Sequence, residues 1–423
     1  MKRVLVLAYD FPPQGGTGVI RVTKLVKYLP AHGWSPVVVC ADAASSPDPG
    51  LLAELPADLE VHRVPWPGWL RPLWSVPSAA DASGPPGRVG GRRPRLRWAR
   101  RLLVPEPAIL WLPGAERAAA RVLGGAPVDA LLSTSPPNAI HLAARLLAAR
   151  FELPWVADFR DPWTAAGAVV AGPGFLGRTF QRRLERGVLA AADRTMTISE
   201  PLAAATEAAF GDVLRRPVAV ITNGFDPDDF AAPPPPLDPG FTLTYVGTVL
   251  GTRTDNAFPE GLRLALARSA AFRSRACVRF VGALAPEYRA RLAGLEANVE
   301  VLPFVTHDEA LRLMRGARAL LLLLPREPVA AMTFTGKFFE YLAARRPMLA
   351  VAPPGVVADL VRDEGIGRAA PPGDPEAIAA ALLELFAAVE ADPTGTAPSE
   401  AILARFDRRR LAGRMAAILD EVA

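Results

Sequence analysis

The sequence contains one pattern twice: a short apolar segment followed directly by a glycine loop. The first copy is Val4–Tyr9 and the second is Phe241–Val246. The loops that follow carry Gly15, Gly16 and Gly18 in the first copy and Gly247 in the second. A buried parallel strand that enters a glycine loop and then a helix lets backbone N–H groups and the helix dipole approach a phosphate. The repetition therefore predicts two α/β domains with a phosphorylated ligand bound in the cleft between them.

The length and one proline-rich segment predict how the chain is divided. A chain of 423 residues corresponds to two or three domains of ordinary size. The segment AAPPPPLDPG, residues 231–240, has the composition of a stiff linker. We therefore expect an N-terminal domain over 1–230, the linker over 231–240 and a C-terminal domain over 241–405. A final helix over 406–423 is expected to pack back towards the first domain. Residues 42–110, rich in Pro, Gly and Arg, are expected to form an irregular insertion in the first domain.

Segments typical of strands alternate with segments typical of helices in both halves of the chain. The run from Ala319 to Leu324 is apolar at every position, as expected for a central parallel strand buried on both faces. This alternation produces parallel sheets joined by right-handed crossovers. The predicted fold class is α/β, with two Rossmann-like parallel-sheet domains facing across a cleft.

The sequence favours a cytoplasmic protein. Its longest apolar run is far shorter than the ~20 residues that span a bilayer, and no apolar signal-peptide core follows Met1. The two cysteines, Cys40 and Cys277, lie in apolar segments of different predicted domains. This placement favours free thiols in a reducing compartment over a disulfide.

An arginine-rich stretch lies within the predicted insertion. Residues Arg88–Arg101 contain seven arginines, with Leu96 and Trp98 among them and no acidic residue. One interpretation is a solvated loop; the other is a cationic surface that contacts anionic lipid or a pyrophosphate-linked acceptor. The second would place the protein peripherally on the inner face of the cell membrane. Nucleic acid is not expected as a partner, because no nucleic-acid-binding module surrounds the stretch.

Several longer motifs occur together in a specific order. They are FPPQGGTGVIRVTKLVKYLPAHGW, SPPNAIHLAA, LPWVADFRDPW, ITNGFDPDDF, TGKFFEYLAARRPMLA and GIGRAAPPGDPEAIAAAL. Between Phe11 and Phe386 they resemble the large family-4 (group 1) class of retaining, nucleotide-sugar-dependent glycosyltransferases. The resemblance implies the GT-B architecture, with the donor bound in the second domain and the acceptor mainly in the first. It also implies no cofactor and no bound metal, because basic residues and a helix dipole handle the diphosphate.

The strongest local motif is Thr335-Gly336-Lys337 with Glu340, at the start of a predicted helix. Gly336 would let a diphosphate approach the helix N-terminus, where Lys337 adds a positive charge. Glu340 would accept hydrogen bonds from a ribose diol; the alternative is an ordinary helix start with a solvated Lys–Glu pair. Members of the family have two glutamates seven residues apart, and Glu340 matches the second. Met332 stands in the place of the first, which usually lies near the transferred sugar.

The Gly247 loop is the second predicted part of the donor site. Family members often have an arginine directly after this glycine and a lysine five residues later. This chain has Thr248 and Arg253 at the two positions. Arg253 would supply charge to the leaving diphosphate, unless it is a surface arginine. We expect Arg326 or Lys337 to replace the charge missing at Thr248.

The acceptor-side candidates lie in the segment VADFRDPW. Asp158, Arg160 and Asp161 end a predicted buried strand, where open α/β sheets bind ligands. Related enzymes often have a histidine at about the position of Arg160 or Asp161, near the transferred sugar. Asp161 is the first choice for a carboxylate that orients the acceptor or accepts its proton, and Asp158 is the second. The alternative for Arg160 and Asp161 is a local ion pair.

Two further features have an alternative structural interpretation. The first glycine loop and His141, which follows SPPNAI, are assigned to an acceptor or diphosphate loop. The alternative for His141 is a residue on a helix face without a ligand role. The segment Asp226–Asp229 resembles the metal-holding acidic motif of other glycosyltransferases, but it follows an Asn-Gly turn. We interpret it as the cap of a short helix.

Taken together, these features predict an enzyme that transfers a sugar from a nucleoside diphosphate to an acceptor hydroxyl with retention of configuration. The acceptor would be a sugar, a lipid-linked molecule or a natural product, and the setting bacterial surface polysaccharide or glycoconjugate synthesis. Two alternatives stay open: a non-catalytic GT-B binding partner of another transferase, and a nucleotide-sugar epimerase on the same fold.

Overall fold

The computed structural model describes residues 1–42, 49–66, 103–165, 174–249, 257–392 and 398–423. The chain divides into two units. The first consists of Met1–Thr222 with Arg408–Ala423, and the second of Asn223–Asp407.

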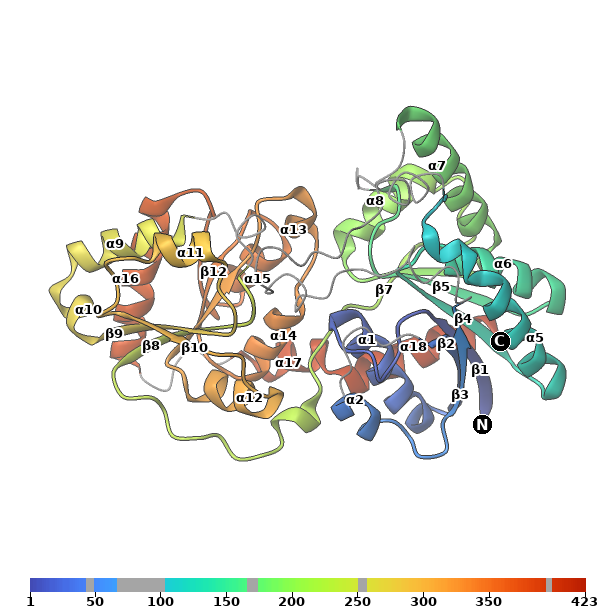
Figure 1. Cartoon of the computed structure of the whole chain (residues 1–423), viewed down its shortest axis with the longest axis horizontal. Coiled ribbons are helices and arrows are strands. Elements are labelled where there is room, and N and C mark those ends of the chain that lie inside the picture. The colour runs from blue at the N-terminus through green and yellow to red at the C-terminus, as the bar shows by residue number, and fades with distance from the viewer. Residues whose placement is uncertain (43–48, 67–102, 166–173, 250–256, 393–397) are drawn as a thin grey trace, which may run out of the picture. The chain divides into compact units, whose positions relative to one another are not determined.

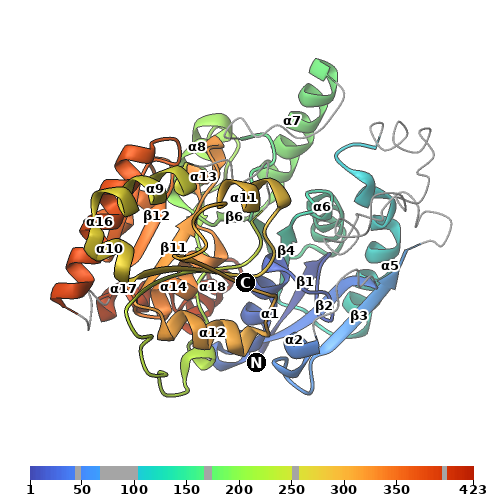
Figure 2. The same ribbon diagram turned by 60° about the vertical axis from the view of Figure 1, so that its left-hand side comes forward.

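The first unit contains a parallel sheet. Its described strands are β1 (Lys2–Ala8), β2 (Trp34–Asp42), β3 (Glu60–Pro65), β4 (Ala130–Ser135), β5 (Trp155–Phe159), β6 (Arg194–Thr197) and β7 (Ala219–Val220). They lie in the order β3-β2-β1-β4-β5-β6-β7, and every pair is parallel. Figure 2 shows β1, β2 and β3 following one another towards one edge of this sheet.

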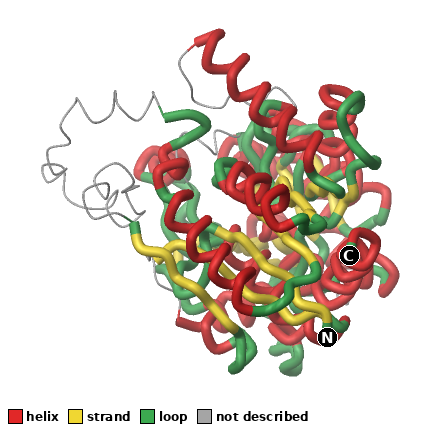
Figure 3. The backbone as a smooth tube through the Cα atoms, turned by 90° about the vertical axis from the view of Figure 1, so that its right-hand side faces the viewer, coloured by secondary structure: helices red, strands yellow, loops and turns green. Residues whose placement is uncertain are grey.

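Helices cover both faces of this sheet (Figure 3). The described helices are α1 (Thr17–Tyr28), η1 (Leu29–His32), α2 (Pro49–Ala53), η3 (Pro107–Leu110), α5 (Leu112–Gly125), α6 (Ile140–Phe151), α7 (Gly174–Ala191), α8 (Glu200–Phe210) and α18 (Arg408–Val422). Alternate residues of β1 point to opposite faces, as a strand requires. Leu5 and Leu7 join the core formed with α5 and α6, whereas Val4 and Val6 join the core formed with α1 and α18.

The second unit contains another parallel sheet. Its described strands are β8 (Phe241–Val246), β9 (Ala276–Val281), β10 (Val299–Leu302), β11 (Ala319–Leu323), β12 (Met348–Val351) and β13 (Gly367–Ala370). Their order is β10-β9-β8-β11-β12-β13, again with parallel pairs throughout. The central strand β11 is buried at every residue, as its continuous apolar run predicts.

The helices of the second unit pack in two layers. Those among the described residues are η5 (Pro227–Phe230), α9 (Phe258–Arg268), α10 (Ala270–Arg275), α11 (Pro286–Arg291), α12 (His307–Gly316), α13 (Pro328–Met332), α14 (Gly336–Ala343), α15 (Val356–Asp363), α16 (Pro375–Ala391) and α17 (Glu400–Phe406). Figure 1 shows α9, α10 and α16 side by side, and their apolar residues share one core with β8. A second core joins β11 and β12 to α12, α14, α15 and α17.

The predicted irregular insertion is wrong for part of its range. Within 42–110 the structure contains α2, β3 and η3. The sequence of Glu60–Pro65 does not predict a strand because this is an edge strand, which among the described strands pairs with β2 alone. Only Val64 of this strand is buried, so His62 and Arg63 interrupt the apolar pattern that marks the central strands.

The proline-rich segment 231–240 lies in the second unit, since the division between the units falls at Thr222/Asn223 and Asp407/Arg408. Asp238 anchors this segment: its backbone N–H donates to the carbonyl of Gly316 over 2.8 Å, and its carboxylate pairs with Arg279 over 2.6 Å. Both cysteines are free thiols, as predicted.

Candidate functional site

Both sheets have the same strand order, which defines where a ligand binds. In each, the first strand lies in the middle, and successive strands are added first on one side and then on the other. The reversal occurs between β1 and β4 in the first unit and between β8 and β11 in the second. Open parallel sheets bind ligands at the carboxyl ends of the strands beside such a reversal. The candidate residues that follow β1 and β8 therefore lie beside the reversals, and those at the end of β5 lie at the same carboxyl edge, one strand further along.

In the second unit, Lys337 lies against the glycine that ends β8. Gly247 has φ of 127°, a backbone conformation that side-chain-bearing residues rarely adopt. A Cβ atom at this position would also collide with Nζ and Cε of Lys337. The missing side chain therefore makes room for the lysine ammonium beside the loop.

Two buried tyrosines connect this loop to α14. Lys337 Nζ donates to Tyr245 Oη over 2.9 Å, and Tyr245 Oη donates to the carbonyl of Thr248 over 3.1 Å. Tyr341, on α14, accepts a hydrogen bond from the backbone N–H of Val246 over 2.9 Å. Both the end of β8 and the lysine beside it are thus held in place by side-chain hydroxyls.

The N-terminus of α14 is suited to an anion. Thr335 is the N-cap residue but makes no side-chain capping hydrogen bond, and the first turn contains no acidic residue. Thr335 Oγ1 is buried and has no hydrogen-bond partner among the described residues. The helix therefore begins at Gly336 with N–H groups and a dipole that no side chain of the described residues caps. Glu340, one turn further on, is half-buried.

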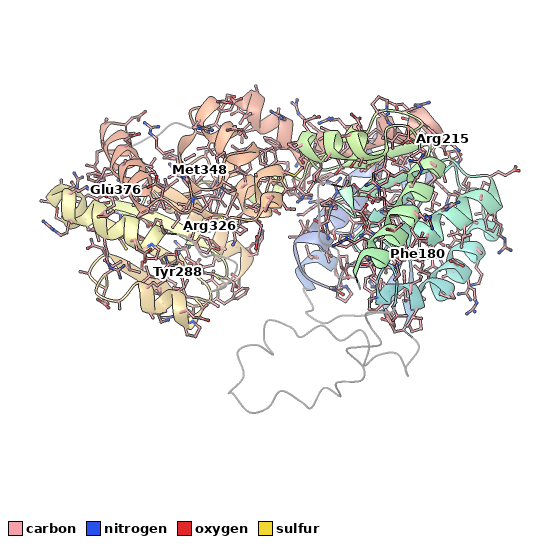
Figure 4. All side chains as sticks on the ribbon, turned by 90° about the horizontal axis from the view of Figure 1, so that it is seen from above. Phe180, Arg215, Tyr288, Arg326, Met348 and Glu376 are labelled. Carbon is pink, nitrogen blue, oxygen red and sulfur yellow. The ribbon has the colours of Figure 1, made fainter. Side chains whose placement is uncertain are left out.

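Three other donor-side candidates differ in position. Arg326 is exposed in the loop after β11 (Figure 4), and its guanidinium lies near the α-carbon of Gly373 in the turn before α16. Met332 is the last residue of α13 and is half-buried. Arg253 lies outside the described residues.

In the first unit, Asp158 is the centre of a buried ion pair. Arg21 donates to both carboxylate oxygens, from Nε and Nη2, over 3.1 Å each. Thr134 Oγ1 also donates to Asp158, over 2.8 Å. The exposed fractions of the two charged side chains are 3% and 1%. Both carboxylate oxygens of Asp158 therefore already accept hydrogen bonds from other side chains of the protein.

Arg160 and Asp161 occupy a more open position. Their ion pair is long, 3.7 Å, and the Asp161 side chain is 60% exposed. The Arg160 guanidinium lies against Gly18, where a Cβ atom would come within 2.6 Å of Cζ. Asp10 accepts a hydrogen bond from Gln14 Nε2 over 2.9 Å. Burial raises the pKa of Asp10, and the Arg160 charge opposes that rise.

His141 is fully buried at the start of α6. Its Nδ1 lies 2.8 Å from Ser133 Oγ, which also accepts from Trp155 Nε1 over 2.8 Å. Burial lowers the pKa of His141 to about 3, although Asp158 nearby opposes the shift. The imidazole is therefore neutral at physiological pH and part of the interior. Its Nε2 has no hydrogen-bond partner among the described residues.

Helix α7 holds the loop that carries Arg160 and Asp161. Trp163 Nε1 donates to Gln181 over 2.9 Å, and the backbone N–H of Thr164 donates to Glu185 over 3.0 Å. Burial raises the pKa of Glu185 to about 7, and the hydrogen bonds from Thr164 act in the opposite direction.

The acidic segment Asp226–Asp229 begins a short helix, as predicted. The Asp226 carboxylate accepts a hydrogen bond from the backbone N–H of Asp228 over 3.0 Å and caps η5.

Sequence reasoning did not select several residues of these sites. They are Asp10, Gln14, Arg21, Tyr245 and Tyr341. For Asp10 and Gln14 a signal was present, since both are polar residues next to the first glycine loop. Tyr245 and Tyr341 could not be selected, because a tyrosine in an apolar segment is typical of any core.

Comparison with known families agrees with this arrangement. The glycosyl transferase 4-like domain matches residues 15–224, and the glycosyl transferases group 1 domain matches residues 242–388. These matches cover most of the chain, which therefore belongs to the group 1, family 4-like glycosyltransferases. It is a GT-B enzyme that transfers a sugar from a nucleotide sugar.

Three solved structures illustrate the shared fold. HepE from Anabaena, in complex with UDP, is 15% identical, with a TM-score of 0.64 over 100% of both chains. Trehalose-6-phosphate synthase OtsA is 12% identical, with a TM-score of 0.66 over 100% of both chains. WaaG, a glycosyltransferase involved in lipopolysaccharide biosynthesis, is 16% identical, with a TM-score of 0.59 over 98% of this chain and 99% of its own. A search of curated proteins gave no match.

Among the residues that the structure describes, no helix has the length and apolar character needed to cross a membrane.

Proposed function

We propose that this chain is a retaining glycosyltransferase in which Lys337, the N-terminus of α14 and the Gly247 loop bind the diphosphate of the donor. The observation that carries the proposal is the position of Lys337, whose ammonium lies beside Gly247 at the strand reversal of the second sheet. A leaving diphosphate gains negative charge as the bond to the sugar breaks. Fixed positive charge and unpaired helix N–H groups stabilise that charge.

Lys337 also replaces the charge that Thr248 does not supply. Its ammonium lies against the residue that precedes Thr248, which places a cation at the loop itself. Arg253, five residues after Thr248 in the sequence and outside the described residues, is proposed to supply a second cation. Glu340, one turn into α14, accepts hydrogen bonds from the ribose hydroxyls of the donor.

Asp161 is the proposed acceptor-side carboxylate, because it is exposed and only loosely paired with Arg160. In the transfer, the acceptor oxygen bonds to the anomeric carbon and the bond from that carbon to the phosphate oxygen breaks. The acceptor proton passes to Asp161 or to the leaving diphosphate. Asp158 is assigned a positioning role, since Arg21 and Thr134 occupy its oxygens.

Uridine nucleotides are the first donors to test, because the HepE structures contain UDP and UDP-glucose. Thermal shift with a panel of UDP-, GDP-, ADP-, TDP- and CMP-sugars should identify the base. Calorimetry should then show that Lys337→Ala and Glu340→Ala each weaken binding of the matching diphosphate by roughly 1–3 kcal/mol. Glu309→Ala is the control, because the Glu309 side chain is 39% exposed and its ion pair among the described residues is with Arg312 on the same helix. Unchanged affinity in both test variants would remove the donor-site assignment.

Retention is tested on the product. Once an acceptor is identified, NMR of the product should show that the new glycosidic bond has the same anomeric configuration as the donor sugar. Inversion would contradict the proposed stereochemistry without affecting the donor site.

We further propose a cytoplasmic enzyme that works peripherally on an anionic membrane surface, on a lipid-linked acceptor of glycoconjugate synthesis. Support comes from the seven arginines of Arg88–Arg101, which lie outside the described residues. Helix α7 adds exposed Arg178 and Arg183 and the half-exposed Phe180 (Figure 4). Each basic residue near an anionic leaflet contributes about 1 kcal/mol.

Vesicle co-sedimentation tests the membrane proposal. We expect binding to anionic but not neutral vesicles, lost at high salt and in a variant with Arg92, Arg93, Arg95 and Arg97 changed to Ser. If the unmodified protein stays in the supernatant with anionic vesicles at low salt, the enzyme acts on a soluble sugar or natural product instead.

A further inference from the structure

Tyr245 is almost completely buried, yet its hydroxyl reaches the donor loop. The residue lies on β8 with 1% of its surface exposed, two positions before Gly247. Its ring packs in the core beside Phe280, with the ring centroids 5.8 Å apart. The hydroxyl at the end of this fixed ring donates to the carbonyl of Thr248 and accepts from Lys337 Nζ.

Lys337 depends on this hydroxyl for its position. Lysine has four rotatable side-chain bonds, and fixing them costs entropy that some contact must offset. Among the described residues, Tyr245 is the only hydrogen-bond partner of the Lys337 ammonium. The same ammonium lies 4.6 Å from the centroid of the Tyr245 ring. One side chain therefore supplies both contacts that hold the cation.

We infer that Tyr245 is a positioning residue that holds the Lys337 ammonium beside Gly247, where it meets the donor diphosphate. This inference rests on the proposed function, in which Lys337 binds that diphosphate. By bonding the Thr248 carbonyl as well, Tyr245 fixes the loop and the cation relative to one another. It touches neither the sugar nor the reacting atoms and acts through Lys337.

The chain offers a matched control in Tyr341. This residue is equally buried, and its hydroxyl also holds the end of β8, but through the backbone N–H of Val246. Replacing either tyrosine by phenylalanine keeps the ring and removes one hydroxyl. Only Tyr245→Phe removes a hydrogen bond to Lys337.

The test compares a nucleoside diphosphate with its nucleoside. Affinities of UDP and uridine, or of the corresponding pair for the base found to bind, are measured by calorimetry for the unmodified protein, Tyr245→Phe and Tyr341→Phe. We expect Tyr245→Phe to weaken binding of the diphosphate about tenfold, the typical effect of one hydrogen bond to a charged group. Binding of the nucleoside should stay unchanged. Tyr341→Phe should change the two affinities by the same factor.

A double-mutant cycle separates this inference from the proposed function. In a Lys337→Ala background, Tyr245→Phe should have no further effect on diphosphate affinity. An equal loss for diphosphate and nucleoside, or a full tenfold loss in the Lys337→Ala background, would overturn the positioning role. If Lys337→Ala itself leaves diphosphate affinity unchanged, the proposed contact between Lys337 and the diphosphate fails instead. Melting temperatures of all variants check that each is folded.

Discussion

Replacing Asp158 with asparagine should destabilise the first unit strongly. The change keeps the size of the side chain but removes the negative charge that balances Arg21. That guanidinium is only 3% exposed, and its hydrogen bonds include two to the Asp158 carboxylate and one to the carbonyl of Thr222. The buried Arg21 guanidinium would lose the carboxylate that accepts two of its hydrogen bonds.

The magnitude follows from the burial of the pair. Removing one partner of a buried ion pair costs about 3–5 kcal/mol, because the remaining charge stays desolvated. For a domain of about 150–250 residues, 1 kcal/mol corresponds to roughly 2–4 °C in melting temperature, and the first unit falls in this range. We therefore expect Asp158→Asn to lower its melting temperature by about 6–20 °C.

Tryptophan emission reports on this unit alone. All eight tryptophans precede residue 164, and none lies in the second unit, Asn223–Asp407. Asp161→Asn is the control, because Asp161 is 60% exposed and its ion pair with Arg160 is 3.7 Å long. Exposed pairs contribute little to stability, so the melting temperature of this variant should be nearly unchanged while its turnover falls.

The reasoning is refuted by the reverse result. If Asp158→Asn melts within about 3 °C of the unmodified protein and yet loses more than a hundredfold in turnover, Asp158 takes part in the chemistry. If Asp161→Asn retains full turnover, Asp161 is not the acceptor-side carboxylate.

Two further predictions concern pH and metal ions. The ordinary pKa of Glu185 is 4.5, and burial raises it to about 7 in the native state, so the native protein keeps a proton that the unfolded chain releases. Stability of the first unit should therefore fall by about 3 kcal/mol as pH rises from 4.5 to 7, and Glu185→Gln should flatten this part of the profile in denaturant titrations. Chelation with EDTA should leave the transfer rate unchanged, because protein cations and the α14 N-terminus carry the diphosphate charge; a rate lost with EDTA and restored by Mg²⁺ would contradict this.

The central strands could be predicted because a strand buried on both faces is a continuous apolar run in the sequence. The apolar run Ala319–Leu324 coincides with β11, Ala319–Leu323, in which every residue is buried. The strands that escaped prediction lack this signal. β13 consists of Gly367–Ala370, four residues that include one arginine and no large apolar side chain. Its position is fixed by pairing with β12, a contact that only the assembled sheet provides.

The candidate sites were predictable as residue types but not as contacts. Gly247 and Lys337 were each selected from local motifs, yet Tyr245 and Lys337 are 92 residues apart in sequence. Arg21 and Asp158 are separated by 137 residues. Local spacing carries no information about such pairs, so it could not distinguish the enclosed Asp158 from the exposed Asp161. Local spacing also could not predict that His141 is buried, because its contact with Ser133 forms only when α6 packs on the sheet.

The glycines that follow the first strand of each unit have one feature in common, and a substitution can test its importance. In both units a glycine after the first strand leaves room for a cation from another element: Lys337 beside Gly247, and Arg160 beside Gly18. Gly18 is the cleaner probe, because Gly247 has a positive φ that strains any side chain, whereas Gly18 lies in α1. In a helix, alanine is favoured over glycine by about 1 kcal/mol.

Gly18→Ala should therefore displace Arg160 without unfolding the helix. With an identified acceptor, we expect the acceptor KM to rise about tenfold, the cost of losing one charged hydrogen bond, while donor affinity stays constant. Adding Arg160→Ala to Gly18→Ala should change little, since the first substitution already removes the cation from its place. If the acceptor KM of Gly18→Ala is normal but that of Arg160→Ala is raised, Arg160 acts from another position and the glycine serves only the backbone. If neither variant alters it, the cation beside the first glycine loop has no part in acceptor binding.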